Sequence, residues 1–180
     1  MHVLRNDVLI RCDSQSSDNV LDVGCMALQM ITDSASKGFI VGIDYSQTMV
    51  KQSAKRNKSE IGEGKVAILS GNVLALPFID ASFDKVCGVE TFYFWPDPLI
   101  GLKEIRRVLK PGGTIALVMD ISKEVADDSV TEDIGSRLGF QVYSGEELKS
   151  MLLEAGFTNV RHEALPERGK GWLCAIGVGT

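Results

Sequence analysis

Short apolar runs alternate with amphipathic stretches along most of this chain. Five runs have the length and composition of buried strands, and they span residues 20–23, 39–43, 66–69, 83–89 and 114–119. Amphipathic segments with helical spacing lie between several of them, as in 98–109, where apolar residues recur every three or four positions. No segment repeats at a fixed period. Strands that alternate with helices predict an α/β fold with a doubly wound sheet.

Capping signals set the expected limits of the helices. Residues 26–36 are expected to form a helix that Gly38 ends, and Ser46 is expected to begin a helix that runs to about Lys58. Pro98 marks the first turn of the next helix. Ser144 and Glu147 have the spacing of a capping box, which predicts a helix from there to residues 155–156.

The end of the chain predicts two further strands, 157–163 and 172–178. The connection between them, about residues 164–171, is too short for a parallel crossover, so we expect them to be antiparallel neighbours. The segment 110–113 is expected to stop the preceding helix and turn the chain. The resulting expectation is a mostly parallel, seven-stranded sheet with an antiparallel last strand.

Composition places the chain among ordinary globular proteins. It has 180 residues, of which 44% are hydrophobic and 24% are charged. This size predicts a single domain over residues 1–180, with residues 1–18 as a short segment before the first strand. The net charge of −5, without a basic run, argues against a nucleic-acid partner.

Four scattered cysteines and two histidines give neither a disulfide framework nor a metal site. Cysteines in apolar, strand-like surroundings are typical of a reducing compartment, which favours a cytoplasmic protein. No apolar run reaches the roughly 18 residues of a membrane span, and the first residues lack a signal-peptide pattern.

Asp44 is the clearest candidate for binding chemistry. It ends the second expected strand, where a carboxylate can accept hydrogen bonds from the two hydroxyls of a ribose. The alternative is that Asp44 only stabilises the N-terminus of the following helix through the helix dipole.

Four motifs in matching order resemble those of class I S-adenosylmethionine-dependent methyltransferases, in the branch similar to the ubiquinone/menaquinone-biosynthesis enzymes. The resemblance runs from about Asn19 to Val178, and its motifs are residues 20–25, 41–46, 71–84 and 106–113. It implies a Rossmann-like methyltransferase fold, S-adenosylmethionine as the cofactor, a small-molecule acceptor and no metal. The acceptor atom and the oligomeric state stay open.

The resemblance also implies roles for individual residues. Gly24 would let the backbone approach the methionine part of the cofactor, and Asp22 would order this loop and accept from the cofactor amino group. Asn72 would accept from the adenine amine. The full set of expected cofactor contacts is Asp22, Gly24, Asp44, Tyr45, Met49, Asn72, Val73 and Glu90.

On the acceptor side, the resemblance implies that Tyr93, Phe94 and Trp95 wall the substrate pocket, because aromatic rings hold a flat or apolar molecule. Their alternative role is packing onto the following helix. Glu90 is a weak candidate for a catalytic base, and it is equally suited to orienting the methionine tail of the cofactor.

Two departures from the family pattern favour a different class of protein. Met26 and Leu28 stand where glycines are usual, and only 18 residues precede the first strand, so the N-terminal lid helices are expected to be reduced or absent. These departures predict weak or absent cofactor affinity, and they leave a catalytically silent, methyltransferase-like binding module as the alternative. A nicotinamide-dependent oxidoreductase is disfavoured by the 71–83 motif and the antiparallel last strand.

Overall fold

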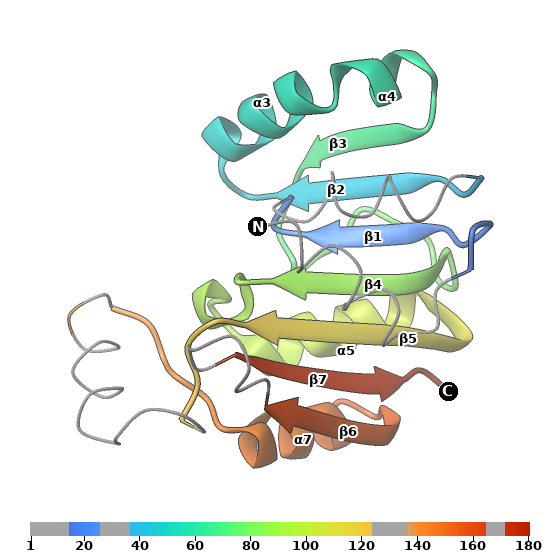
Figure 1. Cartoon of the computed structure of the whole chain (residues 1–180). Coiled ribbons are helices and arrows are strands. Elements are labelled where there is room, and N and C mark those ends of the chain that lie inside the picture. Colours follow the sequence, from blue (N-terminus) through green and yellow to red (C-terminus); the bar gives the residue numbers. More distant parts are fainter. Residues whose placement is uncertain (1–14, 26–36, 124–136, 138, 165–171) are drawn as a thin grey trace.

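The computed structural model describes residues 15–25, 37–123, 137, 139–164 and 172–180. Seven strands form one sheet in the order β3-β2-β1-β4-β5-β7-β6 (Figure 1). The strands are β1 (Val20–Val23), β2 (Ile40–Asp44), β3 (Val66–Ser70), β4 (Phe83–Val89), β5 (Leu109–Met119), β6 (Thr158–Ala164) and β7 (Leu173–Val178). The helices among these residues are α3 (Gln47–Arg56), α4 (Lys58–Gly62), the short 3₁₀ helix η1 (Phe92–Phe94), α5 (Pro98–Val108) and α7 (Gly145–Glu154).

The directions of the strands confirm the predicted doubly wound sheet. β1 pairs in parallel with both β2 and β4, and the order of strands in the chain reverses between β1 and β4. β3 and β5 extend the parallel part on either side. β7 runs antiparallel between β5 and β6, as the short final connection predicts.

Both faces of the sheet are buried at its central strands, which explains why these strands read as continuous apolar runs, whereas the edge strands β3 and β6 are more exposed. α5 and α7 lie on the same side of the sheet (Figure 1), and their residues Leu102, Ile105, Leu148 and Leu152 are fully buried. The opposite face contributes a second apolar cluster that includes Val20, Ile40, Val66, Cys87 and Val118.

The predicted Ser46 cap forms, because its side chain accepts from Met49 N at the start of α3. At the start of α5, Asp97 accepts from Ile100 N, a cap that was not predicted. Both hydrogen bonds of the Ser144 capping box are present. The prediction of one helix to about Lys58 is wrong at its end, because α3 stops at Arg56 and α4 follows from Lys58.

The start of the fifth strand also differs from the prediction. β5 begins at Leu109, which pairs with Phe83, and the register then shifts before Thr114 pairs with Lys85. Gly112 has a φ of +79°, and its N–H donates to Gly179 O, while Gly179 N donates to Gly113 O. The Pro-Gly-Gly segment is therefore an irregularity within a strand rather than a separate turn, held by the end of the chain.

Two expectations fall outside the described residues: the reduced lid at the N-terminus, and the helix over 26–36 that contains Met26 and Leu28. Among the described helices, none is both long and apolar enough to cross a membrane. The described side chains also form no cluster of three or more His, Cys, Asp or Glu that could hold a metal ion.

Candidate active site

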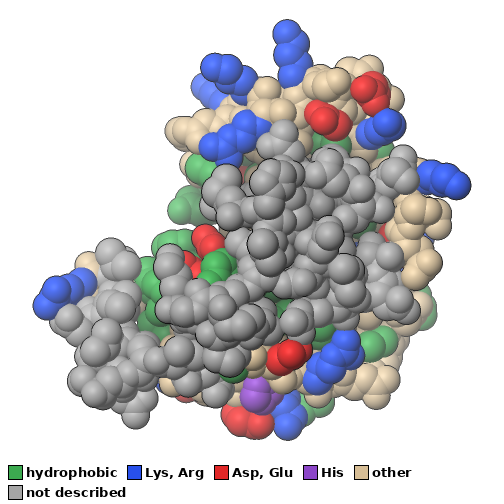
Figure 2. All heavy atoms as spheres, viewed as in Figure 1, with side chains coloured by type: hydrophobic (Ala, Val, Ile, Leu, Met, Phe, Trp, Pro, Cys, Tyr) green, Lys and Arg blue, Asp and Glu red, His purple; other side chains and the backbone are tan. Residues whose placement is uncertain are grey.

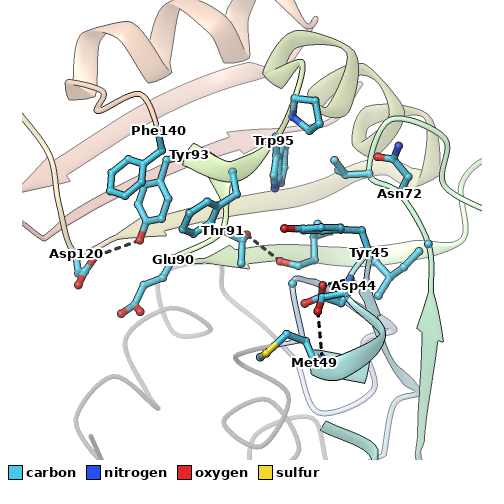
Figure 3. A pocket seen from close by; sticks show the side chains of 18 of the residues that line it. Asp44, Tyr45, Met49, Asn72, Glu90, Thr91, Tyr93, Trp95, Asp120 and Phe140 are labelled. Carbon is cyan, nitrogen blue, oxygen red and sulfur yellow. Dashed lines mark hydrogen bonds between the residues drawn. The ribbon is translucent and has the colours of Figure 1, made fainter. Parts of the chain in front are cut away.

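A cleft of about 720 Å³ opens at the carboxyl ends of the parallel strands (Figure 3). Each of five neighbouring strands brings lining residues at or just after its end, among them Gly24 for β1, Asp44 for β2, Asn72 for β3, Glu90 for β4 and Asp120 for β5. The cleft therefore lies at the point where the strand order reverses. Ligands of open α/β sheets bind at this position.

Asp44 is held by the turn that leads into α3. The residue is only 9% exposed, and its Oδ1 accepts a hydrogen bond from Ser46 N at 2.8 Å. Burial raises the pKa of Asp44, and the hydrogen bond from Ser46 lowers it in part. The side chain thus has both of its expected features: it lines the cleft, and it lies at the N-terminus of a helix.

Tyr45 and Met49 lie on the same flank of the cleft as Asp44 (Figure 3). Tyr45 is 75% exposed, whereas Met49 is half-buried on the first turn of α3. The exposed ring of Tyr45 has little packing of its own to keep it in place. This favours a ligand contact over ordinary core packing for Tyr45.

Asn72 forms a tight turn after β3. Its Oδ1 accepts from Leu74 N at 3.0 Å, and its main-chain oxygen accepts from Ala75 N at 3.0 Å. Val73 is buried and lines the cleft beside it. The amide oxygen of Asn72 is therefore engaged on one side, but an amide oxygen has two lone pairs and can accept a second hydrogen bond.

Gly24 is required by the protein itself. Its φ is +107°, and a Cβ there would overlap the Cγ2 methyl of Thr91. Thr91 is fixed in turn, because its hydroxyl donates to Val23 O at 2.9 Å. The close packing of these two loops accounts for the glycine without any ligand, a reason that the sequence interpretation did not contain.

Asp22, by contrast, is fully buried within β1 and is not among the described residues that line the cleft. The Sγ of Cys87, on the neighbouring strand β4, lies 3.6 Å from Asp22 Oδ1. The structure thus brings seven of the eight expected cofactor residues to one cleft and leaves Asp22 beneath it.

Glu90 adopts a backbone conformation that is unusual for its type. Its φ is +55°, and its N–H donates to Val118 O at 2.7 Å on β5. A left-handed conformation costs a non-glycine residue roughly 1–2 kcal/mol. The strained backbone turns the chain directly after β4, and the Glu90 side chain lines the cleft between Asp44 and Asp120 (Figure 3).

The other end of the cleft is aromatic. The ring of Tyr93 stacks on Phe140 with centroids 4.9 Å apart and planes 25° apart. Phe94 meets both rings edge-on and is 54% exposed. The Tyr93 hydroxyl donates to Asp120 Oδ1 at 3.1 Å. Burial, then the carboxylates of Asp120 and Glu90, raise the pKa of Tyr93, so this hydroxyl keeps its proton.

Trp95 lies at the boundary between the cleft and the core. It lines the cleft, yet it is only 8% exposed and packs against Phe92 with centroids 4.9 Å apart. A Cβ at Gly101 would lie 2.8 Å from Trp95 Cε3, so the indole lies close against the backbone of α5.

Asp120 and Phe140 line the cleft but were missed by the sequence interpretation. Asp120 could have been predicted from the sequence, because it comes at the end of an apolar strand just as Asp44 does. Phe140 could not have been predicted, since it follows a polar stretch of sequence and lies next to Tyr93 only in the folded chain.

Comparison with known proteins identifies the family. The family described as "Methyltransferase domain" matches residues 21–117. O-methyltransferase resE of Aspergillus sclerotiorum is 30% identical over 175 residues, which is 91% of this chain and 65% of the relative. Demethylmenaquinone methyltransferase of Geobacillus kaustophilus is 36% identical over 113 residues, 61% of this chain and 48% of the relative. The chain thus spans about half to two thirds of the length of these two relatives.

Solved structures share the fold over nearly the whole chain. A SAM-dependent methyltransferase from Aquifex aeolicus superposes with a TM-score of 0.79 at 22% identity, covering 98% of this chain and 89% of that one. Phosphoethanolamine N-methyltransferase 2 of Haemonchus contortus, solved with S-adenosyl-L-methionine, gives 0.82 at 16% identity, covering 98% and 52%. The match to the family over more than half of the chain shows that the chain belongs to this methyltransferase-domain family, and the solved structures show that it has the fold of S-adenosylmethionine-dependent methyltransferases.

Proposed function

We propose that this chain transfers a methyl group from S-adenosylmethionine, bound along the cleft, to a small-molecule acceptor held at the aromatic end. One observation carries this proposal. A single cleft joins the buried carboxylate of Asp44 at one end to the rings of Tyr93 and Phe94 at the other, so donor and acceptor can lie end to end.

The donor lies on the β1 and β2 side in this proposal. Asp44 accepts from the ribose hydroxyls, and Tyr45 and Met49 flank the adenine. Asn72 and the Val73 amide bind the edge of the adenine. The methionine part passes Gly24 and Glu90, and Asp22 supports the loop after β1 from below.

Methyl transfer from a sulfonium needs little covalent help, because the positive sulfur already activates the methyl group. The protein must align nucleophile, methyl carbon and sulfur and keep water away. Buried aromatic walls suit this task. We assign Glu90 to the ammonium of the methionine tail rather than to proton abstraction, since it lies between the two ends of the cleft.

The substitution Asp44→Asn tests the donor site. Asparagine keeps an oxygen that can accept from Ser46 N but loses the charge, so affinity for S-adenosylhomocysteine should fall by roughly 1.5–3 kcal/mol, about 12- to 140-fold. NMR titration with ligand up to millimolar concentration measures this even where wild-type binding is weak.

Glu63→Gln is the matched control, because Glu63 is exposed, pairs with the exposed Lys65 and does not line the cleft. Equal affinity of wild type and Asp44→Asn for S-adenosylhomocysteine would show that Asp44 does not bind the ligand. Binding of NAD without binding of S-adenosylhomocysteine would overturn the proposed function.

A further inference from the structure

Among the described residues, the charged side chains that line the cleft all have one sign. Asp44, Glu90 and Asp120 are acidic, and the described lining residues include no Lys, Arg or His. Lysines and arginines instead gather at the edge of the molecule formed by α3 and α4 (Figure 2), where Lys51, Lys55, Arg56 and Lys58 are exposed. Walls of one charge concentrate ligands of the opposite charge, so this cleft favours cations.

The aromatic end adds a second preference for positive charge. Tyr93, Phe94 and Phe140 form a three-ring cluster, with Tyr93 and Phe140 stacked and Phe94 meeting both edge-on. The face of an aromatic ring is negative and attracts ammonium groups within about 6 Å. The half-exposed ring of Phe94 leaves part of this cluster open to a ligand.

Asp120 is the carboxylate that belongs to this aromatic end. It lies beside Tyr93 and Phe140, away from Asp44 (Figure 3). Its Oδ1 accepts from the Tyr93 hydroxyl, and the stacking of Tyr93 on Phe140 fixes that hydroxyl in place. Since a carboxylate has two oxygens and several lone pairs, the same group can still accept from a ligand.

The three carboxylates divide between the two substrates. On the proposed function, Asp44 binds the uncharged ribose hydroxyls and Glu90 binds the ammonium of the donor. Asp120 lies beyond both, at the acceptor end. The donor therefore offers no positive group to Asp120 other than the sulfonium, which cannot donate a hydrogen bond.

We propose that the acceptor carries a protonated amine attached to an aromatic or apolar body, and that Asp120 together with the Tyr93, Phe94 and Phe140 rings binds that amine. This inference rests on the proposed function for the position of the donor. It disfavours acceptors that would place a carboxylate or phosphate beside Asp120, because the two like charges would repel each other.

A series of three probes of similar size tests the inference: phenethylamine, 2-phenylethanol and 3-phenylpropionate. Each is titrated by NMR into the protein with S-adenosylhomocysteine present, and again without it. We expect phenethylamine to bind about tenfold more tightly than the alcohol, and the carboxylate to bind most weakly.

Asp120→Asn should lower the affinity for phenethylamine to that for 2-phenylethanol, and it should change the affinity for S-adenosylhomocysteine by no more than about twofold. Asparagine can still accept from Tyr93, so the ring cluster should persist, and Glu63→Gln should behave as wild type. A loss of structure alone would weaken all three probes together, whereas the proposed role removes only the preference for the amine.

Equal binding of the three probes, no binding of any of them, or an amine preference that survives in Asp120→Asn would each overturn the inference. Failure of the proposed function has a different signature, because S-adenosylhomocysteine would then not bind to wild type. The titrations without S-adenosylhomocysteine report on Asp120 and the rings in that case as well.

Discussion

Phe94 and Trp95 are neighbours in the chain, but they differ in burial and in packing. Phe94 is 54% exposed, whereas Trp95 is 8% exposed and packs on Phe92 and Gly101. We expect Phe94→Ala to weaken binding of an aromatic acceptor with little change in stability. Trp95→Ala should lower the free energy of unfolding by about 3–5 kcal/mol, because it empties a buried site.

Urea unfolding and titration of each variant with phenethylamine and S-adenosylhomocysteine measure these effects. The two substitutions serve as controls for each other, since both delete an aromatic ring from the wall of one cleft. A loss of stability in Phe94→Ala as large as that in Trp95→Ala would show that Phe94 is structural packing rather than a substrate contact.

At single positions, the sequence can indicate that a residue matters without showing which contact makes it necessary. Gly24 was expected to let the backbone approach a ligand, but the partner that requires a glycine there is Thr91, 67 positions further along the chain. The φ of +55° at Glu90 could not be predicted, because a glutamate carries no mark of a left-handed backbone as a glycine does. Contacts of this kind exist only once β1 and β4 are paired.

Arg107 joins helix α5 to the loop that carries Asn72 and Val73. Its guanidinium donates to the main-chain oxygens of Leu76 and Phe78 and to the carboxylates of Glu104 and Asp80. The single ammonium group of a lysine cannot make all of these hydrogen bonds, which need the planar, forked guanidinium group. Arg107→Lys should therefore reduce the free energy of unfolding by roughly 1–3 kcal/mol and weaken binding of S-adenosylhomocysteine.

Thermal unfolding and the same NMR titration measure this prediction. Arg56→Lys, on the exposed end of α3, is the control and should change neither quantity. If Arg107→Lys unfolds at the wild-type temperature, the loop does not depend on the guanidinium fork. The prediction for donor binding fails separately if only stability changes.

Elements with strong local signals were predicted almost to the residue, as in β4 and the helix that Ser144 caps. The misplaced start of β5 has a clear cause. Pro111, Gly112 and Gly113 are typical of a turn, but pairing of Gly112 and Gly113 with Gly179 keeps the segment in the sheet. Local turn chemistry cannot reveal a partner at the far end of the chain.

On the scale of the whole molecule, the cleft is a product of topology. Alternation of strands and helices predicts that the carboxyl ends of β1, β2 and β4 meet, and this brings Asp44, Gly24 and Glu90 together. The aromatic end was predicted only in part. Tyr93 and Phe94 were expected there, but Phe140 and Asp120, which complete the wall, follow β5 and lie in a stretch without periodic pattern.

The last prediction concerns how tightly the molecule holds its donor. Met26 and Leu28 lie outside the described residues, directly after Gly24 and Cys25, whose positive φ values of +107° and +53° show that the loop turns sharply there. Side chains in such a loop would intrude where backbone meets ligand. We therefore expect wild-type affinity for S-adenosylhomocysteine to be weaker than micromolar, and the double variant Met26→Gly, Leu28→Gly to bind more tightly.

The control exchanges the side chains without removing them, as Met26→Leu, Leu28→Met, and should bind as wild type does. A micromolar dissociation constant for the wild-type chain, or weaker binding by the glycine variant in its folded form, would show that the loop accommodates the donor as it is.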